Sequence, residues 1–235
     1  MHLFVVRHAQ SFVNLDDWAD GFIDAGLTPL GQQQARRMAA WVRDHIAVDV
    51  MYVSTMARTQ ETAQFVTDET GIKALPDHRL REFGNCYASG LPVPPEAMPI
   101  FYPDFWGTQF PYRPISEVGE SWTLFTLRVS AFMTDLVARH GDSTQNVMVV
   151  CHGGVIEAIF DHIFNLGLRE RQVEILTHNT AIDHWEYRGS ATGREPWRLH
   201  AHGLAQHLVQ ESAQWLGSKP LLRAAARPLA DAGDD

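Results

Sequence analysis

Two histidines directly follow apolar stretches of the sequence, and both have neighbours suited to binding a phosphate. Residues 3–6 are Leu, Phe, Val and Val, and this stretch ends at Arg7 and His8. A guanidinium binds phosphate through two parallel hydrogen bonds, and a neutral imidazole beside it can attack phosphorus as a nucleophile. Arg7 and His8 are therefore candidates for a phosphoryl-transfer site. The alternative is that they simply end a strand in solvent.

The second histidine, His152, follows the apolar residues 146–151 and precedes Gly153 and Gly154. Glycines at the start of a helix allow an anion to approach the backbone N–H groups closely. Gly153 is therefore a candidate phosphate-binding residue beside His152. The two histidines can meet only if their strands are neighbours in one sheet.

Arg58 is a further candidate cation. It falls in the first turn of a helix expected after Ser54 and Thr55. The helix dipole favours anions over cations at that place by about 0.3–1 kcal/mol. An arginine placed against this preference indicates that it binds phosphate together with the helix end. An arginine in solvent is the alternative.

All of these residues must be positioned by a sheet, because unbroken apolar stretches are typical of parallel strands that are covered on both faces. Ligands bind at the carboxyl edge of such sheets. The pattern predicts an α/β fold, a three-layer α/β/α sandwich with a mostly parallel central sheet. Strands are expected near residues 3–6, 49–53, 73–75, 146–151, 172–177, 181–187 and 197–201, and helices near 29–46, 56–69, 117–140 and 155–164.

The domain organisation follows from length and composition. The 235 residues are 45% hydrophobic and 20% charged, which is typical of a globular chain. We expect one domain over residues 1–217, with a mobile tail over residues 218–235. An insert at about residues 88–118 is rich in proline and aromatic residues, so it cannot form a regular helix or central strand. Its length favours a lid over the carboxyl edge of the sheet, or else a cover for a neighbouring face of the core.

The charge pattern restricts the partners. The formal net charge is −9, so the chain lacks the overall positive charge typical of proteins that bind nucleic acid or an anionic membrane. It has no apolar stretch of 18 residues and no basic N-terminal region followed by a long apolar segment. We therefore expect a cytoplasmic protein with no nucleic-acid or membrane partner. The sequence makes no prediction about its oligomeric state.

The segment RHAQSxxN, from Arg7 to Asn14, resembles the signature of the histidine phosphatase superfamily, the phosphoglycerate-mutase-like enzymes. Other segments resemble the family at the expected places: Ser54 followed by Arg58 and QETA, GES at residues 119–121 followed by Arg128, HGG at 152–154 and NTA at 179–181. The resemblance implies that His8 becomes transiently phosphorylated. It also implies that the substrate is a phosphorylated small molecule.

The resemblance assigns Glu82 as the proton donor. Leu80, Glu82 and Gly84 are similar to the LxExxxG-like segment of the family, although the glycine spacing is tighter here. Without the resemblance, a glutamate beside two arginines is more typical of a surface ion pair.

The remaining roles complete the expected site. Arg7, Arg58 and a protonated His152 would hold the phosphoryl oxygens, and Asn14 would add a side-chain donor. These groups can compensate the charge of the transferred phosphoryl group without a metal or another cofactor.

A metal site is not expected elsewhere in the chain. His200 and His202 are two residues apart on one expected strand, as two metal ligands could be. However, no cysteine or carboxylate cluster accompanies them, so the sequence predicts no bound metal.

Three functions are compatible with these residues. A phosphatase that hydrolyses phosphomonoesters through phosphohistidine at His8 is the first. A phosphoglycerate-type mutase would need cationic contacts for a second anionic group, and the aromatic insert offers chiefly Arg113. A non-catalytic phosphate-binding or interaction module would keep the fold but let Glu82 point away from the site. We favour the phosphatase.

Overall fold

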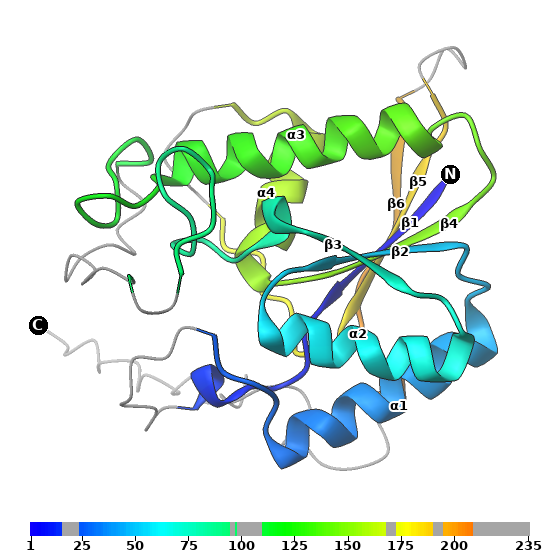
Figure 1. The fold of residues 1–235 in the computed structure, drawn as a ribbon. Coiled ribbons are helices and arrows are strands. Elements are labelled where there is room, and N and C mark those ends of the chain that lie inside the picture. The colour runs from blue at the N-terminus through cyan, green and yellow to red at the C-terminus, as the bar shows by residue number, and fades with distance from the viewer. Residues whose placement is uncertain (16–23, 95–96, 98–109, 168–172, 190–194, 209–235) are drawn as a thin grey trace, which may run out of the picture.

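The computed structural model describes residues 1–15, 24–94, 97, 110–167, 173–189 and 195–208, and it shows a central sheet between two layers of helices (Figure 1). The strands are β1 (His2–Arg7), β2 (Val50–Ser54), β3 (Ala74–Asp77), β4 (Asn146–Cys151), β5 (Ile182–Tyr187) and β6 (Trp197–Leu204). The helices are α1 (Pro29–His45), α2 (Ala57–Thr70), α3 (Trp122–His140) and α4 (Gly153–Phe164), with short 3-10 turns at Phe12–Asn14, His78–Leu80 and Gln206–Leu208.

The sheet has the order β3-β2-β4-β1-β5-β6. The pairs β3–β2, β2–β4 and β4–β1 are parallel, whereas β1–β5 and β5–β6 are antiparallel. The predicted α/β sandwich with a mostly parallel sheet is therefore confirmed. Because β1 and β4 are parallel neighbours, their carboxyl ends lie side by side, which is the condition for His8 and His152 to meet.

The strand residues divide the core into two halves. Leu3 and Val5 of β1 pack on the face that α3 and α4 cover, while Val6 packs on the opposite face with Met38 and Val42 of α1. Figure 1 shows α3 and α4 on one side of the sheet and α1 and α2 on the other. Apolar side chains on successive residues therefore serve both faces, as expected for a strand covered twice.

Helix starts agree with the sequence in one place and differ in two. Helix α1 begins at Pro29 as predicted, and Thr28 caps it, because the Thr28 hydroxyl accepts a hydrogen bond from Gly31 N at 3.0 Å. However, α2 begins at Ala57 after Met56, so Ser54 and Thr55 are not its cap. Likewise, α3 begins at Trp122 after the cap Ser121, and not at residue 117.

The C-terminal part of the sheet also differs from expectation. A strand was expected over residues 172–177, but residues 173–177 have no regular structure. The chain there crosses the carboxyl edge of the sheet, where Thr177 accepts a hydrogen bond from Arg7 Nη1. This stretch therefore pairs with a side chain of the candidate site and not with a strand.

Two predicted segments lie partly or wholly outside the described residues. Residues 95–96 and 98–109 of the insert at 88–118 belong to this group, so the lid stays a prediction, and the tail at 218–235 belongs to it entirely. At the described base of the insert, Tyr87 pairs with Gly119 and Pro114 pairs with Ser121. Phe110 and Tyr112 are both exposed there, with 50% and 71% of their surfaces accessible.

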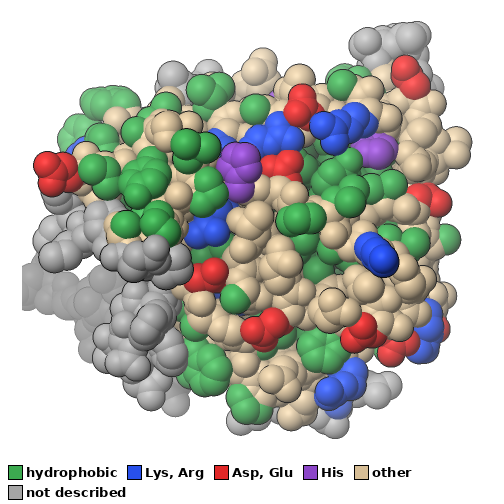
Figure 2. Space-filling view, viewed as in Figure 1, with side chains coloured by type: hydrophobic (Ala, Val, Ile, Leu, Met, Phe, Trp, Pro, Cys, Tyr) green, Lys and Arg blue, Asp and Glu red, His purple; other side chains and the backbone are tan. Residues whose placement is uncertain are grey.

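The surface agrees with a chain of mixed charge. Figure 2 shows Lys and Arg side chains interspersed with Asp and Glu on the visible face, without a large patch of one sign. Among the described helices, none is both long and apolar enough to cross a membrane.

Candidate active site

His8 and His152 meet at the carboxyl edge of the sheet. Arg7 at the end of β1 is in register with Cys151 at the end of β4, and His8 N donates to Cys151 O at 2.9 Å. The ring centroids of His8 and His152 are 5.1 Å apart, edge to face. Both rings are buried, with 3% and 0% of each residue exposed. Two strands far apart in the sequence therefore bring two imidazoles to one buried site.

The backbone fixes the tautomer of His8. Its Nδ1 lies 2.7 Å from the carbonyl oxygen of Ala9, which can only accept, so Nδ1 carries the proton. Its Nε2 lies 3.2 Å from Arg58 Nε, which can only donate, so Nε2 keeps a lone pair. Burial lowers the pKa of His8 well below 6.5, and the charges of Arg58 and Arg7 lower it further. His8 is therefore a neutral imidazole with its lone pair directed at the arginine.

Two guanidiniums lie near His8, and one of them contacts its lone pair. Arg58 is 3% exposed and, as predicted, lies in the first turn of α2. Burial lowers its pKa to about 10, so it stays charged at neutral pH. Arg7 is anchored through Nη1 to Thr177 O, while its buried Nε has no hydrogen-bond partner among the described residues. Burial lowers the pKa of Arg7 as well, and Glu82 opposes this shift.

His152 is held by the end of strand β2. Its Nε2 lies 2.9 Å from Ser54 Oγ, and its buried Nδ1 has no hydrogen-bond partner among the described residues. Burial lowers the pKa of His152 well below 6.5, followed by the charges of Arg58 and His8. The free site thus favours a neutral His152, in contrast to the protonated ring expected from the sequence, because two arginines and a second imidazole already surround it. A bound dianion would favour the proton again.

Glu82 points into this site from the loop after β3. Its Oε2 accepts a hydrogen bond from Gly154 N at 3.2 Å, in the first turn of α4, and its Oε1 accepts from Phe83 N at 2.9 Å. Glu82 is close enough to raise the pKa of both Arg7 and Arg58. The carboxyl group is thus held beside the histidine pair and is not a surface ion-pair partner.

A buried ion pair supports the loop that carries Glu82. Arg128 Nη2 and Glu120 Oε1 are 2.7 Å apart, and their side chains are 5% and 1% exposed. Glu120 also accepts from Gly84 N at 3.1 Å, and Arg128 Nη1 donates to Arg81 O at 3.0 Å. The pair therefore holds the backbone on both sides of Glu82.

Removing half of that pair should cost considerable stability. We expect Arg128→Met to lower the free energy of unfolding by about 3–5 kcal/mol, because a buried carboxylate loses its counter-ion. Burial already raises the pKa of the Glu120 carboxyl against the opposing effect of Arg128. The double variant Glu120→Gln/Arg128→Met should recover part of the loss. Urea unfolding measures both, and equal losses in the two variants would show that the ion pair itself is not the cause.

Hydrogen bonds through the side-chain amide of Asn179 connect Asn14 to the backbone of His8. Asn14 Oδ1 accepts from Ser11 N at 3.1 Å and from Asn179 Nδ2 at 3.4 Å. Asn179 Nδ2 also donates to His8 O at 3.0 Å. Asn14 and Asn179 thus fix the backbone that follows the candidate nucleophile, and a role of Asn14 as a phosphate donor stays a prediction.

The two glycines after His152 have different surroundings. A Cβ atom on Gly154 would lie 2.4 Å from Glu82 Oε1, whereas a Cβ atom on Gly153 would meet nothing nearer than Arg7 Nε at 3.8 Å. We expect Gly154→Ala to displace Glu82 and to reduce turnover of alkyl phosphates by about 10- to 100-fold, a part of what a general acid contributes. Gly153→Ala, the matched control in the same turn, should lose less. Steady-state kinetics of the two variants test this, and an equal loss in both would contradict it.

The buried neutral histidines should make the fold sensitive to acid. His8 and His152 have pKa values below 6.5 in the folded chain and about 6.5 when unfolded. The unfolded chain therefore binds more protons below pH 6.5, and stability falls as pH falls, by up to about 1.4 kcal/mol per pH unit for each histidine. The free energy of unfolding is measured against pH in phosphate-free buffer. There, His8→Gln should reduce the slope by up to about 1.4 kcal/mol per pH unit, the contribution of one histidine. An unchanged slope in the variant would contradict the buried neutral state.

The structure thus brings five predicted residues to one edge of the sheet, namely Arg7, His8, Arg58, Glu82 and His152, with Gly153 and Asn14 beside them. Sequence reasoning did not assign a role to Ser54, Asn179, Glu120 or Arg128, although each lies in a segment that resembles the family. Their roles depend on partners distant in the sequence, so spacing alone carries no signal for them.

Comparison with known proteins agrees with this geometry. The profile of the histidine phosphatase superfamily (branch 1) matches residues 3–224. Phosphoserine phosphatase 1 of Hydrogenobacter thermophilus is 30% identical over 169 residues, which cover 71% of this chain and 77% of that protein. The 2,3-bisphosphoglycerate-dependent phosphoglycerate mutase of Nitratidesulfovibrio vulgaris is 26% identical over 193 residues, covering 69% and 78%.

A solved structure shows the same fold. The phosphoserine phosphatase of Entamoeba histolytica, in complex with 3-phosphoglyceric acid, superposes with a TM-score of 0.66 at 21% identity, covering 88% of this chain and 99% of that one. The sequence match over nearly the whole chain, together with the paired histidines at the sheet edge, leads to one conclusion: the chain belongs to the histidine phosphatase superfamily.

Proposed function

We propose that the protein is a phosphatase that hydrolyses phosphomonoesters of small molecules through a phosphohistidine at His8. The observation that carries this proposal is the state of His8, a neutral ring whose Nδ1 is fixed by Ala9 O and whose Nε2 accepts from Arg58, with the charge of Arg7 nearby. A nucleophile toward phosphorus needs that lone pair, and the developing charge on the phosphoryl oxygens needs those cations.

In the first step, His8 Nε2 forms a bond to phosphorus and the bond from phosphorus to the ester oxygen breaks. Glu82, which enters this step in its protonated form, gives its proton to the leaving oxygen, so that the product leaves as an alcohol. In the second step, water attacks phosphohistidine, Glu82 takes a proton from that water, and inorganic phosphate leaves with His8 restored. Arg7, Arg58 and His152 hold the phosphoryl oxygens throughout, and the transfer needs no further reactant.

The position of Glu82 supports catalysis over simple phosphate binding. A module that only binds phosphate does not need a carboxylate, which repels the anion. Here the carboxylate is hydrogen-bonded to Gly154 N beside His152, and the buried pair of Glu120 and Arg128 fixes its loop. A fixed acid next to the leaving-group side of a phosphate site is the feature that hydrolysis requires.

Hydrolysis is favoured over mutase activity by the composition of the insert. Residues 88–118 contain one arginine, Arg113, and no lysine. A mutase must hold a second anionic group of its substrate while it returns the phosphoryl group, so it needs further cations near the site. A substrate with an apolar portion and water as the acceptor fits this insert better. The relatives carry both kinds of name, phosphatase and mutase.

A direct comparison of the two activities tests the proposal. The purified protein is supplied with a panel of phosphomonoesters, including phosphoserine and 3-phosphoglycerate, and released phosphate is measured beside the conversion of 3-phosphoglycerate to 2-phosphoglycerate. We expect phosphate release with at least one ester and slow or absent isomerisation. Rapid isomerisation with negligible phosphate release would show that the protein is a mutase and not a phosphatase. No turnover of any ester would favour the non-catalytic phosphate-binding module.

A further inference from the structure

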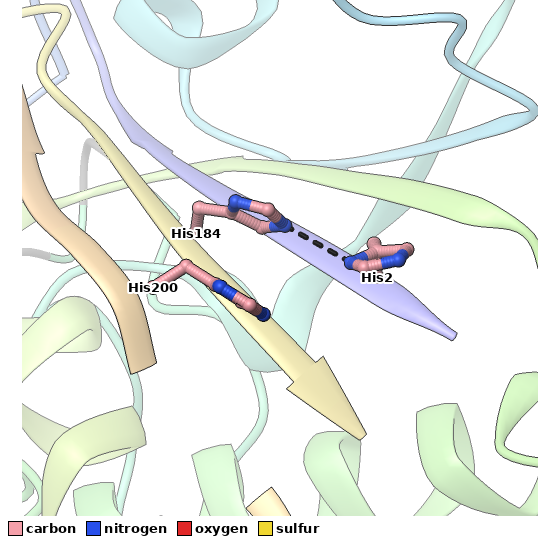
Figure 3. Close-up of side chains that lie close together, drawn as sticks. All are labelled: His2, His184 and His200. Atoms are coloured by element: carbon pink, nitrogen blue, oxygen red, sulfur yellow. Dashed lines mark hydrogen bonds between the residues drawn. The ribbon is translucent and has the colours of Figure 1, made fainter. Parts of the chain in front are cut away.

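A cluster of three histidines lies at the end of the sheet opposite to the candidate active site. His2 comes from β1, His184 from β5 and His200 from β6, and Figure 3 shows their rings side by side across these neighbouring strands. One ring nitrogen from each residue lies within 4.8 Å of those of the other two. His2 Nδ1 and His184 Nε2 are 3.0 Å apart. His2 is six residues from His8, so the backbone positions of these two residues are about 20 Å apart at the usual rise of a strand.

We propose that His2, His184 and His200 bind a single divalent transition-metal ion, with Zn²⁺ as the best-fitting ion. Three imidazoles are a common protein ligand set for zinc, and a fourth position can be filled by water. Zinc–nitrogen bonds of 2.0–2.1 Å in a tetrahedron place the nitrogens about 3.3 Å apart. The pair at 3.0 Å is already close to this separation. A nitrogen of His200 lies within 4.8 Å of the other two, and the His200 ring, which stacks on His184, has to rotate to direct its lone pair at the ion.

Aromatic contacts orient the ring of His184 in the cluster. His184 stacks between Phe4, with ring centroids at 4.5 Å, and His200, at 4.6 Å. These two ring contacts restrict the rotation of the His184 side chain.

The carboxylate of Glu186 lies beside the cluster and contacts His200. Glu186 Oε2 lies 3.0 Å from His200 Nε2, and Arg198 Nη1 is 3.4 Å from the same oxygen. Histidine ligands commonly donate their other N–H group to a carboxylate, which orients the ring and increases its basicity. Glu186 provides this contact for His200, and its charge partly offsets that of a bound cation.

The cluster could not be recognised from the spacing of histidines. His200 and His202 are two residues apart, yet irregular pairing between β5 and β6 gives them different partners. His202 Nδ1 lies 2.8 Å from the buried Asp183, while His200 joins His184 and Glu186. The proposed site therefore differs from the sequence-based expectation of no metal, because it needs ligands from three strands.

Zinc titration of the full chain tests the proposal. The protein is stripped with a chelator, transferred to a buffer without chelator or phosphate, and titrated with ZnCl₂ in a calorimeter. We expect one Zn²⁺ per chain, and His200→Ala should weaken its affinity by about 10- to 100-fold or more, the range that loss of even a supporting residue causes. His202→Ala is the matched control, because both side chains are 34% exposed, and it should bind zinc like the original chain.

Two further readouts separate ligation from packing. Co²⁺ in place of Zn²⁺ should give visible absorption bands of a tetrahedral site, and these bands should vanish in His200→Ala. Circular dichroism should show an unchanged fold for this variant, and phosphate release should be unchanged as well. If His184→Ala fails to fold, His2→Ala and His200→Gln still test the site. The proposal is overturned if the original chain binds no zinc, or if His200→Ala binds it as tightly and at the same stoichiometry.

Discussion

Replacing His8 with alanine should lower kcat/KM for any phosphomonoester by at least about 10⁴-fold, because no other nucleophile replaces the lost imidazole. Near His8, Arg58 donates a hydrogen bond and cannot attack, and Ser54 holds His152 with its ring centroid 5.1 Å from that of His8, so that His152 does not occupy the place of the lost ring. The variant should also fail to form an acid-labile phosphoenzyme when it is mixed with substrate and quenched.

The control for this variant is His45→Ala. His45 is an exposed histidine on α1 whose ring contacts Trp41, and its loss should leave turnover unchanged. Because His8 is buried, thermal unfolding of both variants must show that they are folded. Retained turnover in folded His8→Ala, or acid-labile label on another residue, would reject His8 as the nucleophile.

Replacing Glu82 with glutamine should lower turnover of alkyl phosphates by about 10²- to 10⁴-fold, the usual contribution of a general acid. Glutamine keeps the size of the side chain and can still accept from Gly154 N, so the loop held by Glu120 and Arg128 should stay in place. The loss should be much smaller for p-nitrophenyl phosphate, because nitrophenolate leaves without a proton.

The dependence on the leaving group distinguishes a proton donor from a residue that only shapes the site. A shaping role predicts the same loss for both substrates. Glu117→Gln, which changes an exposed glutamate near the end of the insert, should affect neither substrate. Equal losses for alkyl and nitrophenyl esters in Glu82→Gln would therefore contradict the assignment of Glu82.

The sequence predicted the parallel half of the sheet well because its strands are buried on both faces. The unbroken apolar residues 3–6 and 146–151 have few alternatives to a central strand, and their polar ends had to lie at the carboxyl edge. That β1 and β4 are neighbours in the sheet could not be derived from the sequence of either strand alone. This follows from the order of the whole sheet.

The errors concern segments whose structure depends on tertiary partners. Residues 173–177 look like a strand by composition, but Thr177 O in this stretch accepts a hydrogen bond from Arg7 at the sheet edge. Residues 117–121 continue a helical pattern, yet Glu120 turns to Arg128 and Gly84, so the helix begins only after Ser121. In both cases a contact with a distant residue outweighs the local preference, which spacing in one chain cannot reveal.

The histidines illustrate the same limit for sites. His8 and His152 could be found because each follows a recognisable strand and carries family-like neighbours. His2, His184 and His200 have no such context, and only the antiparallel pairing of β5 with β1 and β6 brings them together. A cluster of this kind is visible only when the register of three strands is known.

A crystal structure with bound vanadate tests most directly whether these side chains converge on one tetrahedral or trigonal anion. The account predicts vanadium bonded to His8 Nε2, vanadate oxygens within hydrogen-bond distance of Arg7, Arg58 and His152, and Glu82 beside the oxygen opposite His8. Vanadate bound elsewhere, or bound at this edge with His8 turned away from it, would contradict the account.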